Sequence, residues 1–123
     1  MKIQESAENY LEVIYTLHMQ TGYVRAIDIA SHLGYSKPSV SRAVKLLREN
    51  DYIAVATSGQ ITLSPKGLSI AENIHERHTL LAKFLVKIGV SETVALEDAC
   101  KMEHVISEET FTQLKAYLNE THT

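Results

Sequence analysis

Residues 26–63 read AIDIASHLGYSKPSVSRAVKLLRENDYIAVATSGQITL, and the helix and strand signals in this segment follow one another in an informative order. Apolar side chains at i, i+3, i+4 and i+7 within residues 26–33 predict an amphipathic helix with one inward face. Gly34 follows at the position where a left-handed residue often ends a helix. Ser36 can then cap a second helix, with Pro38 in its first turn, where the missing N–H costs nothing.

A hairpin is predicted after this second helix, which we expect to close at Asn50-Asp51. Two short runs, Tyr52 to Ala56 and Gln60 to Leu63, are rich in β-branched and aromatic residues, with Ser58-Gly59 between them. Helix, tight turn, helix and hairpin is the order of a winged helix-turn-helix. We therefore predict such a unit from about Tyr23 to Leu63.

Helices are also expected on both sides of this unit. Apolar spacing predicts a helix over residues 5–19, and a long helix should begin at Ser64-Pro65 and run to about residue 88. Two more helices follow, one starting at Val90-Ser91 and one capped by residues 107–109 and ending near Tyr117-Leu118. The predicted fold class is mainly α with a small β-hairpin. We expect an N-terminal domain over residues 1–66 and a helical domain over residues 67–123, bridged by the long helix.

Composition and charge narrow the class of protein. The chain has 123 residues, of which 45% are hydrophobic and 22% charged, so it can fold around a core. Residues 21–67 carry six basic against three acidic side chains, although the whole chain has a net charge of −3. A basic middle between acidic flanks suits a unit that faces phosphate. Neither a signal region nor an apolar run long enough to span a membrane is visible, so we expect a cytoplasmic protein.

The start of the second helix is the predicted DNA-reading surface. In a helix-turn-helix this end of the recognition helix enters the major groove. Arg42 can pair with a guanine edge, and basic side chains further along can contact phosphate. A solvated basic face or a protein-binding surface is the alternative interpretation. The predicted DNA-binding residues are Ser36, Lys37, Pro38, Ser39, Ser41, Arg42 and Lys45.

A second group of polar residues suggests a metal site in the acidic half. Cys100, Glu103 and His104 stand at i, i+3 and i+4, which places them on one face of a predicted helix. A thiolate, a carboxylate and an imidazole together can bind a first-row divalent metal. With side chains from two other predicted helices, the candidate ligands are Asn9, Glu12, His78, Cys100, Glu103 and His104.

Other functions of these residues stay open at this point. A buried cysteine often serves as a small hydrophobe, so the cluster could be structural in a metal-independent winged-helix regulator. An enzyme with Cys100 as nucleophile and His104 as base is a third hypothesis. The sequence has no glycine-rich loop and no obvious oxyanion hole, so this hypothesis ranks last.

The chain resembles the diphtheria-toxin-repressor family of iron- or manganese-dependent transcriptional repressors. The resemblance covers nearly the whole chain and is carried by five blocks: ENYLEVIY (8–15), SKPSVS (36–41), LSPKG (63–67), RH (77–78) and DACKMEHVIS (98–107). It implies a homodimer, not an enzyme, that binds a palindromic operator in double-stranded DNA when Fe²⁺ or Mn²⁺ is bound and represses metal-uptake genes. Co²⁺, Ni²⁺ and Zn²⁺ can bind such sites in vitro. No membrane and no small organic substrate is implied.

The resemblance also assigns the metal ligands to the six candidate positions, and two departures from the family pattern affect the metal. Asn9 stands where family members usually carry Asp or Met, and Ala82 replaces the carboxylate of the ancillary site of iron-type members. Cys100 is the iron-type choice, whereas the short, two-domain length resembles the manganese type. Iron and manganese therefore both remain open.

The last two predicted helices are the expected dimer surface. The predicted interface residues are Leu96, Val105, Ile106, Phe111, Leu114 and Leu118.

Overall fold

The computed structural model describes residues 5–121, with side chains from residue 6 to residue 119. The chain divides into two compact units, the first ending at Glu72 and the second beginning at Asn73. In chain order the elements are α1 (Glu5–Thr21), α2 (Ala26–Leu33), α3 (Lys37–Glu49), β1 (Ile53–Val55), β2 (Ile61–Leu63), α4 (Pro65–Lys87), α5 (Glu92–Met102) and α6 (Glu108–Thr121). Helix α4 supplies residues to both units. The predicted fold class, mainly helical with one hairpin, is confirmed.

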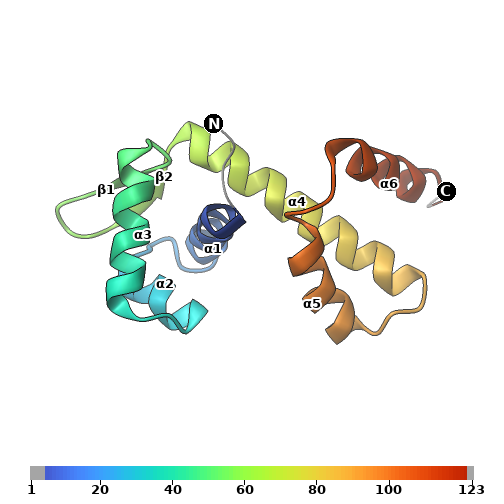
Figure 1. The fold of residues 1–123 in the computed structure, drawn as a ribbon, viewed down its shortest axis with the longest axis horizontal. Helices are drawn as coiled ribbons and strands as arrows, with labels where there is room; N and C mark the ends of the chain where they lie inside the picture. Colours follow the sequence, from blue (N-terminus) through green and yellow to red (C-terminus); the bar gives the residue numbers. More distant parts are fainter. Residues whose placement is uncertain (1–4, 122–123) are drawn as a thin grey trace. The chain divides into compact units, whose positions relative to one another are not determined.

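The N-terminal unit contains α1, α2, α3 and the hairpin (Figure 1). Side chains from all of these elements form one apolar core. Strands β1 and β2 pair antiparallel, with Ile53 opposite Leu63. The Ile61 N–H also donates to the Val24 carbonyl at 2.7 Å, which ties the hairpin to the segment before α2. The largest fully buried side chains of the unit are Leu11, Ile14, Val24, Ile29, Val40 and Ile61. Helices α2 and α3 together with the hairpin form the winged helix-turn-helix.

Local signals place the ends of α2 and α3 where the sequence predicts them. Gly34 follows α2 with φ 72°, a left-handed conformation that glycine adopts without a Cβ clash. The Ser36 Oγ accepts a hydrogen bond from the Ser39 N–H at 3.3 Å, and Pro38 lies in the first turn of α3. Asp51, which follows α3, is left-handed with φ 64°. The recognition helix therefore has a fixed start and a fixed end.

The block LSPKG connects the hairpin to α4 through tightly packed backbone. The Ser64 N–H donates to the Tyr52 carbonyl at 3.0 Å, and the Ser64 hydroxyl donates to the Asp51 carbonyl at 2.7 Å. The Gly67 N–H donates in turn to the Ser64 Oγ at 3.1 Å. A Cβ on Gly67 would overlap the Tyr52 carbonyl oxygen and lie 3.0 Å from its carbonyl carbon. Only glycine therefore fits this close approach. The neighbouring Lys66 ammonium lies over the Tyr52 ring, 4.3 Å from its centroid.

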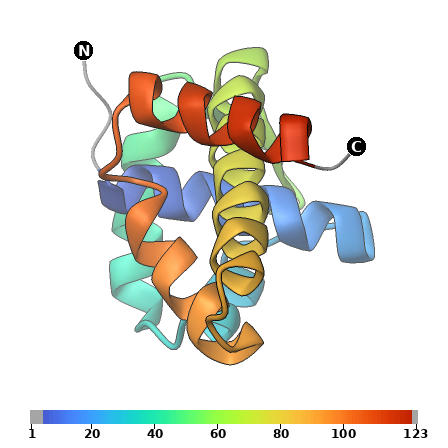
Figure 2. The same cartoon turned by 90° about the vertical axis from the view of Figure 1, so that its right-hand side faces the viewer.

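The C-terminal unit consists of most of α4 together with α5 and α6. In Figure 2, α6 crosses α4, and several side-chain contacts join these helices. The Lys115 ammonium lies 3.1 Å from the Glu76 carboxylate, and the rings of Phe84 and Tyr117 meet edge to face with centroids 6.4 Å apart. Gly89, with φ 107°, lies in the turn that follows α4. Among residues 5–121, no helix combines the length and apolarity that crossing a bilayer requires.

Two helix ends in this unit differ from the prediction. The sequence predicts that residues 100–104 share one helix, but α5 ends at Met102. The N–H groups of Val105 and Ile106 both donate to the Met102 carbonyl, at 3.1 and 3.2 Å, so the backbone tightens into a turn. Helix α6 continues to Thr121 instead of ending near residue 118. Glu103 thus caps α5, and His104 lies beyond the helix.

Candidate metal centre

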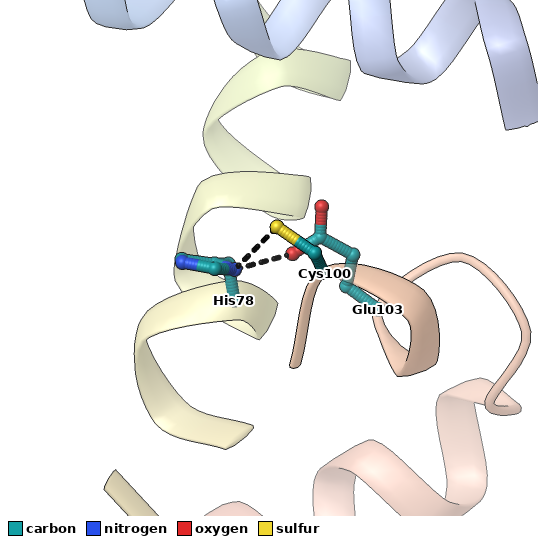
Figure 3. A group of neighbouring side chains, drawn as sticks. All are labelled: His78, Cys100 and Glu103. Carbon is teal, nitrogen blue, oxygen red and sulfur yellow. Dashed lines mark hydrogen bonds and ion pairs between the residues drawn. The ribbon is translucent and has the colours of Figure 1, made fainter. Parts of the chain in front are cut away.

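Three side chains of the C-terminal unit converge on one point (Figure 3). The His78 Nδ1 lies 2.9 Å from the Glu103 Oε2 and 3.8 Å from the Cys100 Sγ. One ligand atom from each of these residues lies within 4.8 Å of the other two. Figure 3 shows the three side chains pointing toward one another, His78 from α4 and the other two from the end of α5. Residues 22 positions apart in sequence therefore share one small site.

The end of α5 explains why Cys100 and Glu103 face the same way. Residues three apart lie on one side of a helix. Glu103 keeps this geometry although it caps the helix, because its φ of −58° and ψ of −25° are helical. Its N–H still donates to the Ala99 carbonyl at 3.0 Å. The i, i+3 spacing read from the sequence therefore holds in the structure.

His104 approaches the same carboxylate from another direction. Its Nε2 lies 3.2 Å from the Glu103 Oε1, whereas His78 meets the Oε2. The Glu103 side chain is only 1% exposed, and that of His104 is 4% exposed. A carboxylate buried this deeply must be paired or bound to a metal, because its desolvation is costly. Two imidazoles provide such partners here.

The donor set and its spacing fit a transition-metal ion. Nitrogen ligands stand about 2.0–2.1 Å and thiolate ligands about 2.3 Å from an ion such as zinc, so donor atoms in one shell are roughly 3–4 Å apart. The separations of 2.9 and 3.8 Å around the His78 Nδ1 fall in that range. Imidazole, thiolate and carboxylate together are typical of sites for softer divalent metals. The residues of the C-terminal unit can therefore hold such an ion.

The other predicted ligands lie in the N-terminal unit. Asn9 and Glu12 are half-buried residues one turn apart on α1. Their participation in a metal site stays a prediction from the sequence. Ala82 follows His78 by one turn of α4 and offers no donor atom.

The predicted DNA-reading residues cluster at the start of α3 and are mostly exposed. Lys37, Ser41, Arg42 and Lys45 are exposed, whereas Ser39 is half-buried. The Arg42 guanidinium reaches back to the Ser39 Oγ at 3.4 Å. Ser36 and Pro38 are exposed as well and shape the helix start. A cationic surface next to a helix N-terminus is suited to phosphate and base edges.

Two arginines have roles that the sequence did not reveal. The Arg25 guanidinium donates to the Ser58 carbonyl at the tip of the hairpin, at 2.7 Å. A Cβ on Gly59 would lie 3.2 Å from the Arg25 side chain, so the hairpin tip packs on this arginine. Arg77 is buried in the C-terminal unit directly before His78. Neither contact can be predicted from a short-range pattern, because Ser58 is 33 residues from Arg25 and Glu108 is 31 residues from Arg77.

The predicted dimer residues differ in exposure. Leu96 and Val105 are 44% and 71% exposed, and Ile106 and Leu114 are half-buried. Phe111 and Leu118 are buried at 4% and 2%. Among the predicted interface residues, Leu96 and Val105 are therefore the ones most accessible to a partner, and the interface as a whole stays a prediction.

Comparison with known proteins gives matches over nearly the whole chain. Residues 2–60 match the family model "Iron dependent repressor, N-terminal DNA binding domain". Residues 64–123 match "Iron dependent repressor, metal binding and dimerisation domain". The transcriptional regulator MntR of Salmonella typhimurium is 33% identical over 117 residues, covering 95% of this chain and 74% of the relative. The HTH-type transcriptional regulator MntR of Geobacillus kaustophilus is 38% identical over 102 residues, covering 83% and 72%.

Solved structures agree with these matches. The manganese regulator SloR has a TM-score of 0.81 at 28% identity, covering 97% of this chain and 55% of that one. A manganese-dependent transcriptional repressor in complex with manganese has a TM-score of 0.82 at 28% identity, covering 92% and 52%. The present chain thus spans about half the length of these solved proteins. With both domain models matched in order, the chain belongs to the iron-dependent repressor family of DNA-binding transcriptional regulators, and the resemblance seen in the sequence is confirmed.

Proposed function

We propose that this protein is a cytoplasmic, homodimeric repressor of metal-uptake genes that binds a palindromic operator when Fe²⁺ or Mn²⁺ is bound. The convergence of His78, Cys100 and Glu103, in a chain that also exposes a basic recognition helix, carries the proposal. Residues 1–66 would form the DNA-binding domain and residues 67–123 the metal-binding and dimerisation domain. Relatives named as manganese regulators support this assignment.

His78, Cys100, Glu103 and His104 would hold the ion, with Glu12 and Asn9 as further ligands expected from the family. The ion would supply positive charge beside the buried carboxylate and the thiolate. The four side chains bind in their thiolate, carboxylate and neutral imidazole forms, so metal affinity should fall as the pH falls. Metal can favour the DNA-binding state only by its difference in affinity for the two states.

The donor set does not choose between iron and manganese. The Cys100 thiolate favours softer ions, and raw affinity at such a site would favour zinc or copper over both. Availability in the cell and coordination geometry would decide the physiological metal. DNA-binding titrations with each metal in turn would identify it.

A metal-independent regulator is the second candidate function. The contacts of Glu103 with His78 at 2.9 Å and with His104 at 3.2 Å favour it, because two imidazoles can act as partners of the buried carboxylate without a metal. In that case the cluster would be structural. Metal uptake by the Cys100→Ala, His104→Ala double variant distinguishes the two candidates, since equal uptake by the variant and the parent protein would favour the structural role.

The main test measures DNA affinity with and without metal. A duplex selected from a random pool by the protein with Mn²⁺ would be titrated by fluorescence anisotropy, first with chelator and then with Mn²⁺ or Fe²⁺. We expect metal to tighten binding about 5- to 150-fold, the usual range of allosteric coupling. The double variant should lose this gain, whereas Lys101→Met, an exposed control on α5, should keep it. Undiminished affinity of the chelated protein would refute metal activation.

We also propose that the protein is not an enzyme. Cys100 lies beside His78 and Glu103 in a set of metal donors, so its thiol is assigned to ligation rather than to nucleophilic attack. A catalytic thiolate would react with a mild alkylating agent near neutral pH when metal is bound. Protection of Cys100 by Mn²⁺ or Co²⁺ supports ligation, and unchanged reactivity with metal would contradict it.

A further inference from the structure

Arg77 is a charged side chain that the C-terminal unit buries directly beside the metal ligands. It precedes His78 on α4 and is 8% exposed. Its Nη1 donates to two backbone carbonyls, that of Glu103 at 3.3 Å and that of Ile106 at 3.0 Å. Its Nη2 donates to the Glu108 carboxylate at 2.7 Å. One guanidinium thus spans both ends of the turn that carries two of the ligands.

Stability alone does not account for a guanidinium at this place. Burying an arginine costs free energy, and replacing a buried ion pair with apolar residues is often neutral or stabilising. The Arg77 Nε is buried without a hydrogen-bond partner among the described residues, which adds to the cost. The Glu108 partner is 74% exposed, so this ion pair is weakened by water and salt. The contact with the Phe111 ring, 5.2 Å away, returns only part of this cost.

The contacts themselves suggest what the guanidinium does. The turn from Glu103 to Ile106 has left the helix, so its carbonyls lack the partners that a continuing helix would give them. Arg77 supplies these partners from the helix that also carries His78. The planar fork of an arginine can meet several acceptors at fixed angles, which a lysine ammonium cannot. The link therefore holds Glu103 and His104 in register with His78.

We propose that Arg77 is a positioning residue of the metal centre, which sets metal affinity by fixing the turn that presents Glu103 and His104. The inference rests on the proposed metal-binding function. Residues that orient metal ligands without touching the ion typically change metal affinity by about 10- to 100-fold when removed. Arg77→Met should therefore weaken Co²⁺ binding by about that factor. Arg77→Lys should restore little of the loss, and Glu108→Gln should weaken binding severalfold.

Anaerobic Co²⁺ titration of the full chain tests this, because the thiolate-to-cobalt absorption band and the ligand-field bands report the coordination directly. Arg77→Met should lower the affinity and alter the ligand-field bands, while circular dichroism stays that of a folded protein. Lys115→Met is the matched control, since it removes the exposed Lys115–Glu76 pair between the same two helices. It should leave both the affinity and the bands unchanged.

The outcomes separate this inference from the function on which it rests. Failure of the unsubstituted protein to bind Co²⁺ would overturn the proposed metal site and the role of Arg77 together. Normal binding and an identical spectrum in folded Arg77→Met would overturn the positioning role alone. If Arg77→Met does not fold, Glu108→Gln decides, because it removes only an exposed carboxylate. Co²⁺ affinity equal to that of the parent protein in this variant would then refute the inference.

Discussion

Replacing Gly67 with alanine should destabilise the protein although glycine is a poor helix former. Gly67 lies in the first turn of α4, where alanine is worth up to about 1 kcal/mol more than glycine by helix propensity alone. The added methyl group would overlap the Tyr52 carbonyl oxygen and lie 3.0 Å from its carbonyl carbon. Because the obstructing atoms belong to the backbone, no side-chain rotation can relieve the contact.

The size of the effect follows from what must move. Forcing a methyl group into closely packed backbone typically costs about 1–3 kcal/mol. Displacing the Tyr52 carbonyl also strains its hydrogen bond with the Ser64 N–H, now 3.0 Å long and worth about 1 kcal/mol net. Set against the gain in propensity, Gly67→Ala should lower the free energy of unfolding by about 1–3 kcal/mol. For a chain of this size, the melting temperature should fall by roughly 4 °C or more.

Urea unfolding followed by circular dichroism measures this change, with chelator present and protein concentration fixed, so that metal and association do not contribute. Ser69→Ala is the control, since Ser69 is exposed on the same helix and should gain a few tenths of a kcal/mol. A Gly67→Ala variant as stable as the parent would show that the approach of α4 to Tyr52 tolerates a methyl group. The interpretation that only glycine fits at this position would then be wrong.

Four further changes test other parts of the N-terminal unit. Asp51→Gly should be about 1 kcal/mol more stable than Asp51→Ala in urea unfolding, because φ is 64° at this position; equal stability would contradict the left-handed turn. Ser36→Ala should cost about 1 kcal/mol in the same assay through loss of the cap on α3, and no loss would remove that role. Arg25→Met should speed hydrogen exchange at the hairpin tip and weaken DNA binding, since the bond to Ser58 is lost; unchanged exchange would exclude an anchoring role. Burial, with Tyr35 nearby, raises the pKa of Tyr10 above its ordinary value, so stability that is present below the ordinary pKa should be lost as the pH rises through the raised one. The ultraviolet difference between the parent protein and Tyr10→Phe should show this tyrosine ionising at a higher pH than an exposed tyrosine, and ionisation at the ordinary pH would contradict the effect of burial.

Local signals in the sequence predict most of the fold. Gly34, Ser36 and Pro38 fix the turn between α2 and α3 by backbone geometry that depends on neighbouring residues only. The hairpin follows from two β-rich runs around Ser58-Gly59, although the strands are shorter than predicted. The position of a helix end that depends on one residue type can therefore be predicted from the local sequence, without knowing how the core packs.

Contacts between distant residues could not be predicted in this way. Arg25 and Ser58 are 33 residues apart, and Arg77 and Glu108 are 31 apart. Both arginines look like ordinary surface charge in the sequence, because nothing nearby shows that one anchors a hairpin and the other is buried. The need for glycine at position 67 could not be predicted either, since the obstructing carbonyl belongs to Tyr52, which is distant in sequence. These constraints become visible only when the chain has folded back on itself.

The metal centre combines both kinds of information. The spacing of Cys100 and Glu103 predicts one shared face, and the structure keeps it. The approach of His78 from α4, 22 residues before Cys100, had no short-range signal. The sequence offered His78 only as a candidate on another predicted helix, and the family resemblance assigned it as a ligand. The prediction that all of residues 100–104 are helical is wrong at its end, because α5 stops at Met102 and His104 lies in the turn that follows.

The end of α5 at Met102 explains how Glu103 can meet two imidazoles. In a continuing helix, neighbouring residues point about 100° apart, so the side chains of Glu103 and His104 would diverge. The turn after Met102 instead brings the His104 Nε2 to 3.2 Å from the Glu103 Oε1, while His78 lies 2.9 Å from the Oε2. The two oxygens of one buried carboxylate thus face two different imidazoles. A helix extended through this turn would turn His104 away from the Glu103 carboxylate, so the break in α5 is the feature that lets His104 approach it. The contacts of Arg77 with the Glu103 and Ile106 carbonyls hold this turn in place.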